Sequence, residues 1–136
     1  MYVPAHFAAD DQAVQDLLTH HGAADLVTMT PDGLMAPCCH LSMTTRGECS
    51  AGNLARNNDH WRQTVVSEAL MIRLGPDLYI SPTWYASKRD HCRVVPTWNH
   101  LTVHAYGSMA VHDDPVWVSG VVRRLSDHHE AARAES

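Results

Sequence analysis

Short apolar runs separated by turn residues fill the middle of this chain, and this pattern predicts a mainly β protein. Leu26–Thr30 and Leu34–Ala36 flank the turn Pro31-Asp32-Gly33, in which Gly33 supplies the positive φ of a hairpin. Further strands are predicted at Leu41–Met43, Cys49–Leu54, Ala69–Leu74, Leu78–Ser81 and Leu101–Ala105. Turns are expected between neighbouring members of this series, at Thr45-Arg46-Gly47 and at Gly75-Pro76-Asp77.

Helical patterns occur near both ends of the chain. Asp10 and Asp11 can cap a helix with one apolar face, which Gly22 is expected to end. Asp114-Pro115 predicts the start of another helix, because an acidic cap followed by proline suits a first turn. The apolar faces consist of Ala13, Val14, Leu17 and Leu18 in the first helix, and of Trp117, Val118, Val121, Val122 and Leu125 in the second.

A third, central helix is predicted from Asp59, with Asn58 as its N-cap and Trp61 and Val65 on one face. Short strands joined by turns, with helices at the periphery, favour a small β-barrel over a parallel sheet, which would need more crossover helices. We therefore predict one barrel domain over residues 1–126. The polar residues 127–136 are expected to form a fraying tail.

Composition excludes some classes of protein. The chain contains no run of about 18 apolar residues, so no membrane span is expected, and the first residues do not resemble a secretory signal. We therefore expect a cytoplasmic protein. The formal charge of −5 argues against a broad basic surface for nucleic acid. Eleven histidines make this charge sensitive to pH near 6.5.

Two thiols and an imidazole stand together at Cys38-Cys39-His40. Thiolates and imidazoles suit zinc, but zinc ligands must converge, and adjacent cysteines seldom do. A cysteine nucleophile with a histidine base is conceivable in such a chain, although no local pattern supports it. We expect no metal site, and the role of this cluster stays open.

An anion site is one interpretation of the segment that precedes the central helix. The N-terminus of a helix offers free N–H groups to phosphate, and Arg56 could add a paired contact, with Asn58 at the cap. The competing interpretation is a plain helix cap beside a surface arginine.

A second candidate site lies in the aromatic block between Gly75 and Gly107. Ser87 and Lys88 offer a hydroxyl and a cation next to aromatic side chains, which suits an anionic group attached to a flat ring. Trp98 could stack on that ring, and Asn99 could bond its polar atoms. A solvated turn and tryptophans that belong to the core are the competing interpretations.

These segments together resemble the PaiB-like proteins, a family of FMN-binding negative transcriptional regulators. The matching stretches run from Met1 to Glu130 and include MYVPAHF, LVTMTPDGLMA, NLARNNDHW, LGPDLYISPTWYASK, VVPTWNHLTVHAYG and HDDPVW. The resemblance implies a split β-barrel that forms a homodimer and holds FMN in a groove between the subunits. It places Arg56 and Asn58 at the FMN phosphate, Ser87 and Lys88 at a second anionic contact, and Thr97, Trp98 and Asn99 beside the isoalloxazine ring.

The resemblance also implies departures and alternatives. The family has histidine where Asn53 stands and tyrosine where His100 stands, and it continues into a C-terminal segment that we expect this chain to lack. A DNA-binding role is implied by the resemblance alone, because no recognition helix is evident. The alternatives are a flavin-dependent oxidoreductase, with His100 or His104 as acid or base, and a degenerate barrel that binds no cofactor.

Overall fold

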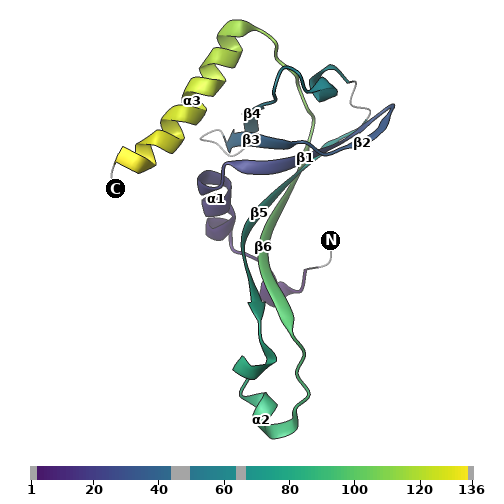
Figure 1. Cartoon of the computed structure of the whole chain (residues 1–136), viewed down its shortest axis with the longest axis vertical. Helices are drawn as coiled ribbons and strands as arrows, with labels where there is room; N and C mark the ends of the chain where they lie inside the picture. The colour runs from purple at the N-terminus through teal and green to yellow at the C-terminus, as the bar shows by residue number, and fades with distance from the viewer. Residues whose placement is uncertain (1–2, 44–49, 64–66, 135–136) are drawn as a thin grey trace.

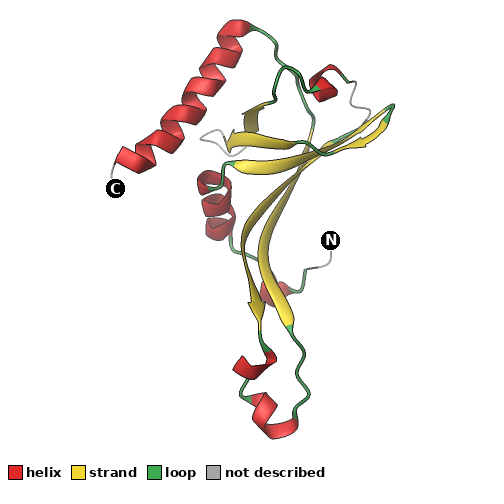
Figure 2. Cartoon of the chain, viewed as in Figure 1, coloured by secondary structure: helices red, strands yellow, loops and turns green. Residues whose placement is uncertain are grey.

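The computed structural model describes residues 3–43, 50–63 and 67–134. The helical elements are η1 (Ala5–Phe7), α1 (Asp11–His20), η2 (Asp59–Arg62), η3 (Pro82–Trp84), α2 (Ser87–His91) and α3 (Pro115–Ala134). The strands are β1 (Ala23–Thr30), β2 (Gly33–Met35), β3 (Cys38–Met43), β4 (Ser50–Asn53), β5 (Ala69–Ile80) and β6 (Thr97–Gly107). Figure 2 shows the helices at the periphery of the strands, so the predicted mainly β class is confirmed.

The strands form an antiparallel sheet in the order β4-β3-β1-β5-β6, with β2 paired to β1. Strands β2 and β3 pair one after the other with the same strand, β1, and in the same register. Thr28 pairs with Met35 of β2, and Asp25, three residues earlier, pairs with Cys38 of β3, three residues later. Within the described residues β4 and β6 do not pair, so the sheet stays open, as in a split barrel. Figure 1 shows β5 and β6 leaving the rest of the sheet as a long hairpin with α2 at its far end.

Local capping rules explain where several elements begin. The Asp10 carboxylate accepts a hydrogen bond from Ala13 N at 2.7 Å and starts α1. The Asp114 carboxylate accepts one from Trp117 N at 2.8 Å, with Pro115 as the first residue of α3. Gly33 has φ of 116°, as the predicted β1–β2 turn requires. These three predictions are confirmed.

The predicted turn at Gly75-Pro76-Asp77 is wrong, because β5 runs through it without reversing. Leu74 pairs with Thr102 and Asp77 pairs with His100, so β5 contains one residue more than β6 in this interval, which is a β-bulge. A bulge accommodates Pro76, which has no N–H to donate to the ladder. A Cβ on Gly75 would lie 2.8 Å from Leu17 Cδ1, so glycine also permits the close approach of α1.

Two helix predictions differ from the structure in extent. Helix α3 continues to Ala134 instead of giving way to a fraying tail at Asp127, and Leu125 and Val121 remain buried along it. The central helix is a single 3-10 turn, η2, and Val65 lies outside the described residues. The predicted turn at residues 45–47 also lies outside them. Among the described helices, none is long and apolar enough to cross a membrane.

The buried core lies on the face of the sheet that α1 and α3 approach. Leu18, Ala24 and Met71 form its centre, and Val14, Leu41, Val103 and Ala105 pack against them. Residues alternate between the faces of a strand, so the neighbours of these core positions on β5 and β6 point away from the helices.

That opposite face of β5 and β6 is rich in exposed apolar side chains. Tyr106 is 65% exposed, Leu74 60%, Trp98 60% and Tyr79 46%. The accessible surface of the chain is 10100 Å², whereas a compact protein of this mass exposes about 7,100 Å². The chain thus leaves roughly 3,000 Å² of extra surface in contact with water.

Candidate functional site

A groove of about 710 Å³ lies between α3 and the core face of the sheet. Its walls are mainly apolar, and they include Leu41, Met71, Ala105, Trp117 and Val121. Arg56, Trp61 and Asp113 also line it. A groove of this volume with few polar groups has the character of a small-molecule site.

Arg56 is the cation of this groove. Its Nη2 donates to the Asp113 carboxylate at 2.6 Å, and its guanidinium carbon lies 5.8 Å from the centroid of the Trp61 ring. The Arg56 carbonyl accepts a hydrogen bond from Trp61 Nε1 at 3.0 Å, which holds the loop and the indole together. An anion at Arg56 would therefore compete with Asp113 or use the remaining guanidinium donors.

Asn58 has a structural role in this loop. Its Oδ1 accepts a hydrogen bond from His60 N at 3.0 Å and caps η2. A single 3-10 turn has little dipole, so the argument that a helix N-terminus attracts phosphate here loses its basis. His60 is fully buried, its Nε2 bonds to the Thr28 hydroxyl, and burial lowers its pKa.

Ser87 and Lys88 begin α2 at the far end of the β5–β6 hairpin, where both are half-buried. Within the described part of the chain, Lys88 makes no ion pair. The C-cap of α2 is Cys92, which has the left-handed φ of 53° and donates its thiol to the Lys88 carbonyl at 3.2 Å. The unpaired ammonium on a short, well-defined turn suits an anionic ligand.

Thr97, Trp98 and Asn99 begin β6, opposite Ile80, Tyr79 and Leu78 respectively. Successive residues of a strand face opposite sides, so Trp98 points to one face and Thr97 and Asn99 point to the other. Trp98 packs beside Tyr79, with ring centroids 6.0 Å apart. The Thr97 hydroxyl lies 3.4 Å from that of Tyr85. The three residues therefore cannot contact one side of a flat ring together.

The predicted site residues fall into two groups at opposite ends of the molecule (Figure 1). Arg56 shares the groove with Gly107 at the end of β6, whereas Trp98 lies at its start. Trp98 and Gly107 are nine positions apart along β6, which corresponds to about 30 Å. FMN is far shorter, so within one chain the structure does not bring Arg56 and Asn58 to the same ligand as Ser87, Lys88 and Thr97–Asn99.

The donor chemistry of the two groups fits FMN. Arg56 and Lys88 are cations for a phosphate, Asn99 offers an amide to the polar edge of a ring, and Trp98 and Trp61 offer flat apolar surfaces. Exposure of Trp98 and Asn99 leaves both available for contact. The residues present therefore fit the flavin in their chemistry. A complete site would need further contacts beside the Arg56 group or beside the group at the hairpin tip.

One buried charged group, Arg73, was not predicted from the sequence. Arg73 on β5 is fully buried, and its guanidinium donates to the carbonyls of Leu18 at the end of α1 and of Leu41 in β3. Burial lowers its pKa. No local pattern marks Arg73, because its partners come from distant parts of the chain.

Cys39 is also buried, and burial, with smaller contributions from Cys38 and Asp25, raises its pKa to about 11. A thiol with this pKa is protonated at neutral pH and makes a poor nucleophile. The suggestion of a cysteine nucleophile at Cys39 is therefore not supported.

Two curated proteins are similar to this chain. An uncharacterised protein of Saccharomyces cerevisiae is 35% identical over 85 residues, which cover 61% of this chain and 50% of that protein. Protease synthase and sporulation protein PAI 2 of Bacillus subtilis is 26% identical over 115 residues, which cover 82% of this chain and 53% of that protein. The chain spans about half the length of the curated relatives it matches.

The family match agrees with the fold and with the donor chemistry. The family described as "Putative FMN-binding domain" matches residues 1–136, and FMN is therefore the cofactor that the match supports. Together with the resemblance to PAI 2, this match shows that the chain belongs to the PaiB-like FMN-binding family.

Proposed function

We propose that this protein binds FMN in a site built from two copies of the chain and acts as a PaiB-type regulatory flavoprotein. The observation that carries the proposal is the separation of the two candidate groups by the length of β6. In a two-fold dimer, the hairpin tip of one copy can reach the Arg56 groove of the other, and the same contact then occurs twice.

The exposed surface supports a second copy as the partner. A stable interface of ordinary size buries about 1,600 Å² in total. The extra surface of this chain exceeds the half of that area that each copy must contribute. The exposed aromatic side chains on β5 and β6 would take part in the interface. The same face carries Trp98, so pairing of two copies would remove its indole from water beside the proposed flavin.

The residues of the chain would divide the work of holding the cofactor. Lys88 and Arg56 would neutralise the phosphate. Trp98 would cover one face of the ring and exclude water from it. FMN itself supplies the redox chemistry of its ring system when it is bound.

The regulatory role is the part of the proposal that rests on family membership. The net charge of −5 is unfavourable for DNA on the protein's own surface, so we place regulation downstream of flavin binding and without direct reading of DNA. Consumption of NAD(P)H by the flavin-loaded protein would favour the oxidoreductase alternative instead.

A complementation experiment tests the shared site. Arg56→Ala and Lys88→Ala should each weaken FMN binding, measured by titration of flavin absorbance or fluorescence. Co-refolding the two variants together should restore one intact site in each mixed dimer, because each variant supplies the cation that the other lacks. Gel filtration of the wild type should report a dimer.

Two results would overturn the proposal. A wild-type protein that ignores added FMN would refute the cofactor assignment for this chain. Tight binding by a monomer, or a mixture that binds no better than its separate components, would show that the site does not need two copies.

A further inference from the structure

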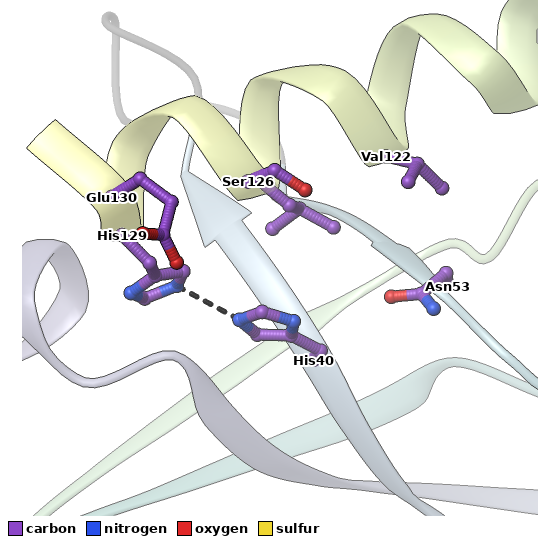
Figure 3. Close-up of a pocket in the computed structure, with 7 residues that line it drawn as sticks. His40, Asn53, Val122, Ser126, His129 and Glu130 are labelled. Carbon is purple, nitrogen blue, oxygen red and sulfur yellow. Dashed lines mark hydrogen bonds between the residues drawn. The ribbon is translucent and has the colours of Figure 1, made fainter.

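His40 and His129 are 89 residues apart in the sequence, yet their Nε2 atoms lie 2.8 Å apart. Figure 3 shows the two rings pointing toward one another, His40 from β3 and His129 from α3. They border a cavity of about 260 Å³, which Asn53, Ser126 and Glu130 also line. In Figure 3 the carboxyl group of Glu130 points from α3 toward the ring pair.

The backbone beneath the pair makes room for it. A Cβ on Gly22 would lie 2.9 Å from Nε2 of His40 and from Nε2 of His129. Any larger residue at position 22 would therefore push the two rings apart. His128, which precedes His129 in α3, donates from Nε2 to the Thr19 carbonyl at 2.9 Å and anchors this part of α3 to α1.

The spacing of the two nitrogens is close to what a single metal ion requires. Two imidazole nitrogens bound to one ion at about 2.0–2.1 Å lie roughly 2.9 Å apart at a right angle and roughly 3.4 Å apart at the tetrahedral angle. The observed 2.8 Å needs an opening of only a few tenths of an ångström and a small ring rotation. His40 is exposed, so its ring can make this adjustment.

We propose that His40 and His129 bind a first-row divalent ion of the nickel and zinc class, with Glu130 as the third ligand. Within residues 3–43, 50–63 and 67–134, no group of three or more such side chains is already assembled around one point. The two imidazoles would therefore supply the first two ligands, and Glu130 would become the third by a change of rotamer. Water would fill the remaining coordination positions of the ion.

The hydrogen bond between the two rings must open for the ion to enter, because one Nε2 atom donates to the other. On binding, the proton between the two Nε2 atoms moves to Nδ1 of its own ring, which leaves both Nε2 atoms free for the ion.

The bound ion would join α3 to β3. The cysteines that adjoin His40 need not take part, because Cys39 is buried and its thiol donates to the Pro37 carbonyl at 3.5 Å. Imidazole and carboxylate ligands suit Ni²⁺, whereas thiolates draw Zn²⁺ strongly. Ni²⁺ is therefore the probe that separates this site from the cysteines.

The test uses the flavin-free protein, so its result is independent of the proposed function. Calorimetric titration with NiCl₂ at neutral pH should give one ion per chain, and the ion should raise the Tm. His40→Ala and His129→Ala should each weaken binding by about tenfold or more, and Glu130→Gln by a smaller factor. The matched control is His6→Ala, which removes an exposed histidine in η1 and should leave affinity unchanged.

A second variant keeps both ligands and changes only the space beneath them. Gly22→Ala should weaken Ni²⁺ binding, with folding checked by circular dichroism. Binding that is unchanged in the double variant His40→Ala/His129→Ala, or absent from the wild type, would overturn the proposal. Full affinity in a folded Gly22→Ala protein would contradict the geometry on which it rests.

Discussion

Arg56 donates from Nη2 to the carboxylate of Asp113 across 2.6 Å, and this contact joins the loop after β4 to the segment that leads into α3. Both side chains line the same groove. They are largely exposed, so the ion pair contributes about 0–1 kcal/mol to stability. A phosphate could therefore displace Asp113 from Arg56 at small cost.

This competition predicts opposite effects of two substitutions on FMN affinity. Arg56→Ala should weaken binding by about 1.5–3 kcal/mol, the usual value of a hydrogen bond to a charged group. Asp113→Asn should leave affinity unchanged or strengthen it, because it removes the competing carboxylate. Flavin titration measures both, and a loss of affinity in Asp113→Asn would show that the carboxylate does not compete.

Lys88 should matter for flavin binding whereas its neighbour should not. Lys88 is half-buried on α2 and Arg89 is exposed, so Lys88→Ala should weaken FMN binding and Arg89→Ala should leave it nearly unchanged. Both changes remove one positive charge, so the comparison separates a specific contact from a general effect of charge. Equal losses in the two variants would argue for the general effect. Flavin fluorescence quenching gives both affinities.

His60 should make the protein less stable in acid. Burial lowers its pKa below the unfolded value of about 6.5. As the pH falls, the unfolded chain therefore binds a proton at His60 more readily than the folded protein does. The contribution of His60 is therefore complete above about pH 6.5 and is lost progressively below it. Urea unfolding at about pH 7.5 and about pH 5.5 should show a smaller pH effect in His60→Gln than in the wild type. His6→Gln is the control, and it should keep the wild-type difference.

The buried guanidinium of Arg73 should contribute strongly to stability. Arg73→Met would leave the carbonyls of Leu18 and Leu41 without this donor, at a cost of about 2–4 kcal/mol in the free energy of unfolding. Arg62→Ala, which removes an exposed pair with Asp59, should cost less than about 1 kcal/mol. Urea denaturation compares the two, and a stable Arg73→Met protein would show that the carbonyls find other donors.

Local sequence rules predicted the elements whose causes are local. Asp10, Gly33 and Asp114 each act on backbone within three residues, so their effects can be read without knowledge of the fold. The prediction at Gly75-Pro76-Asp77 was wrong because pairing with β6 over most of its length holds β5 extended, and the turn residues are accommodated as a bulge. In this case tertiary pairing prevailed over local preference.

The candidate site was only partly accessible to sequence reasoning. The residue types at Arg56, Lys88, Trp98 and Asn99 indicated an anionic ligand with a flat ring, and the family match supports FMN. Their placement at two ends of the molecule could not be anticipated, because residue spacing says nothing about the path of a long hairpin. The alternation along β6, which separates Trp98 from Asn99, depends on that stretch being a strand.

By itself the sequence determined the class of fold, the family and the kinds of side chain available for a cofactor, since caps, turns and motifs are properties of neighbouring residues. Only the tertiary structure decided which distant residues meet. It placed His129 against His40 and Arg73 beneath the end of α1. It also separated Trp98 by about 30 Å of strand from the end of β6 that lines the groove of Arg56. Such contacts depend on the pairing of strands and the packing of helices, which involve the whole chain at once.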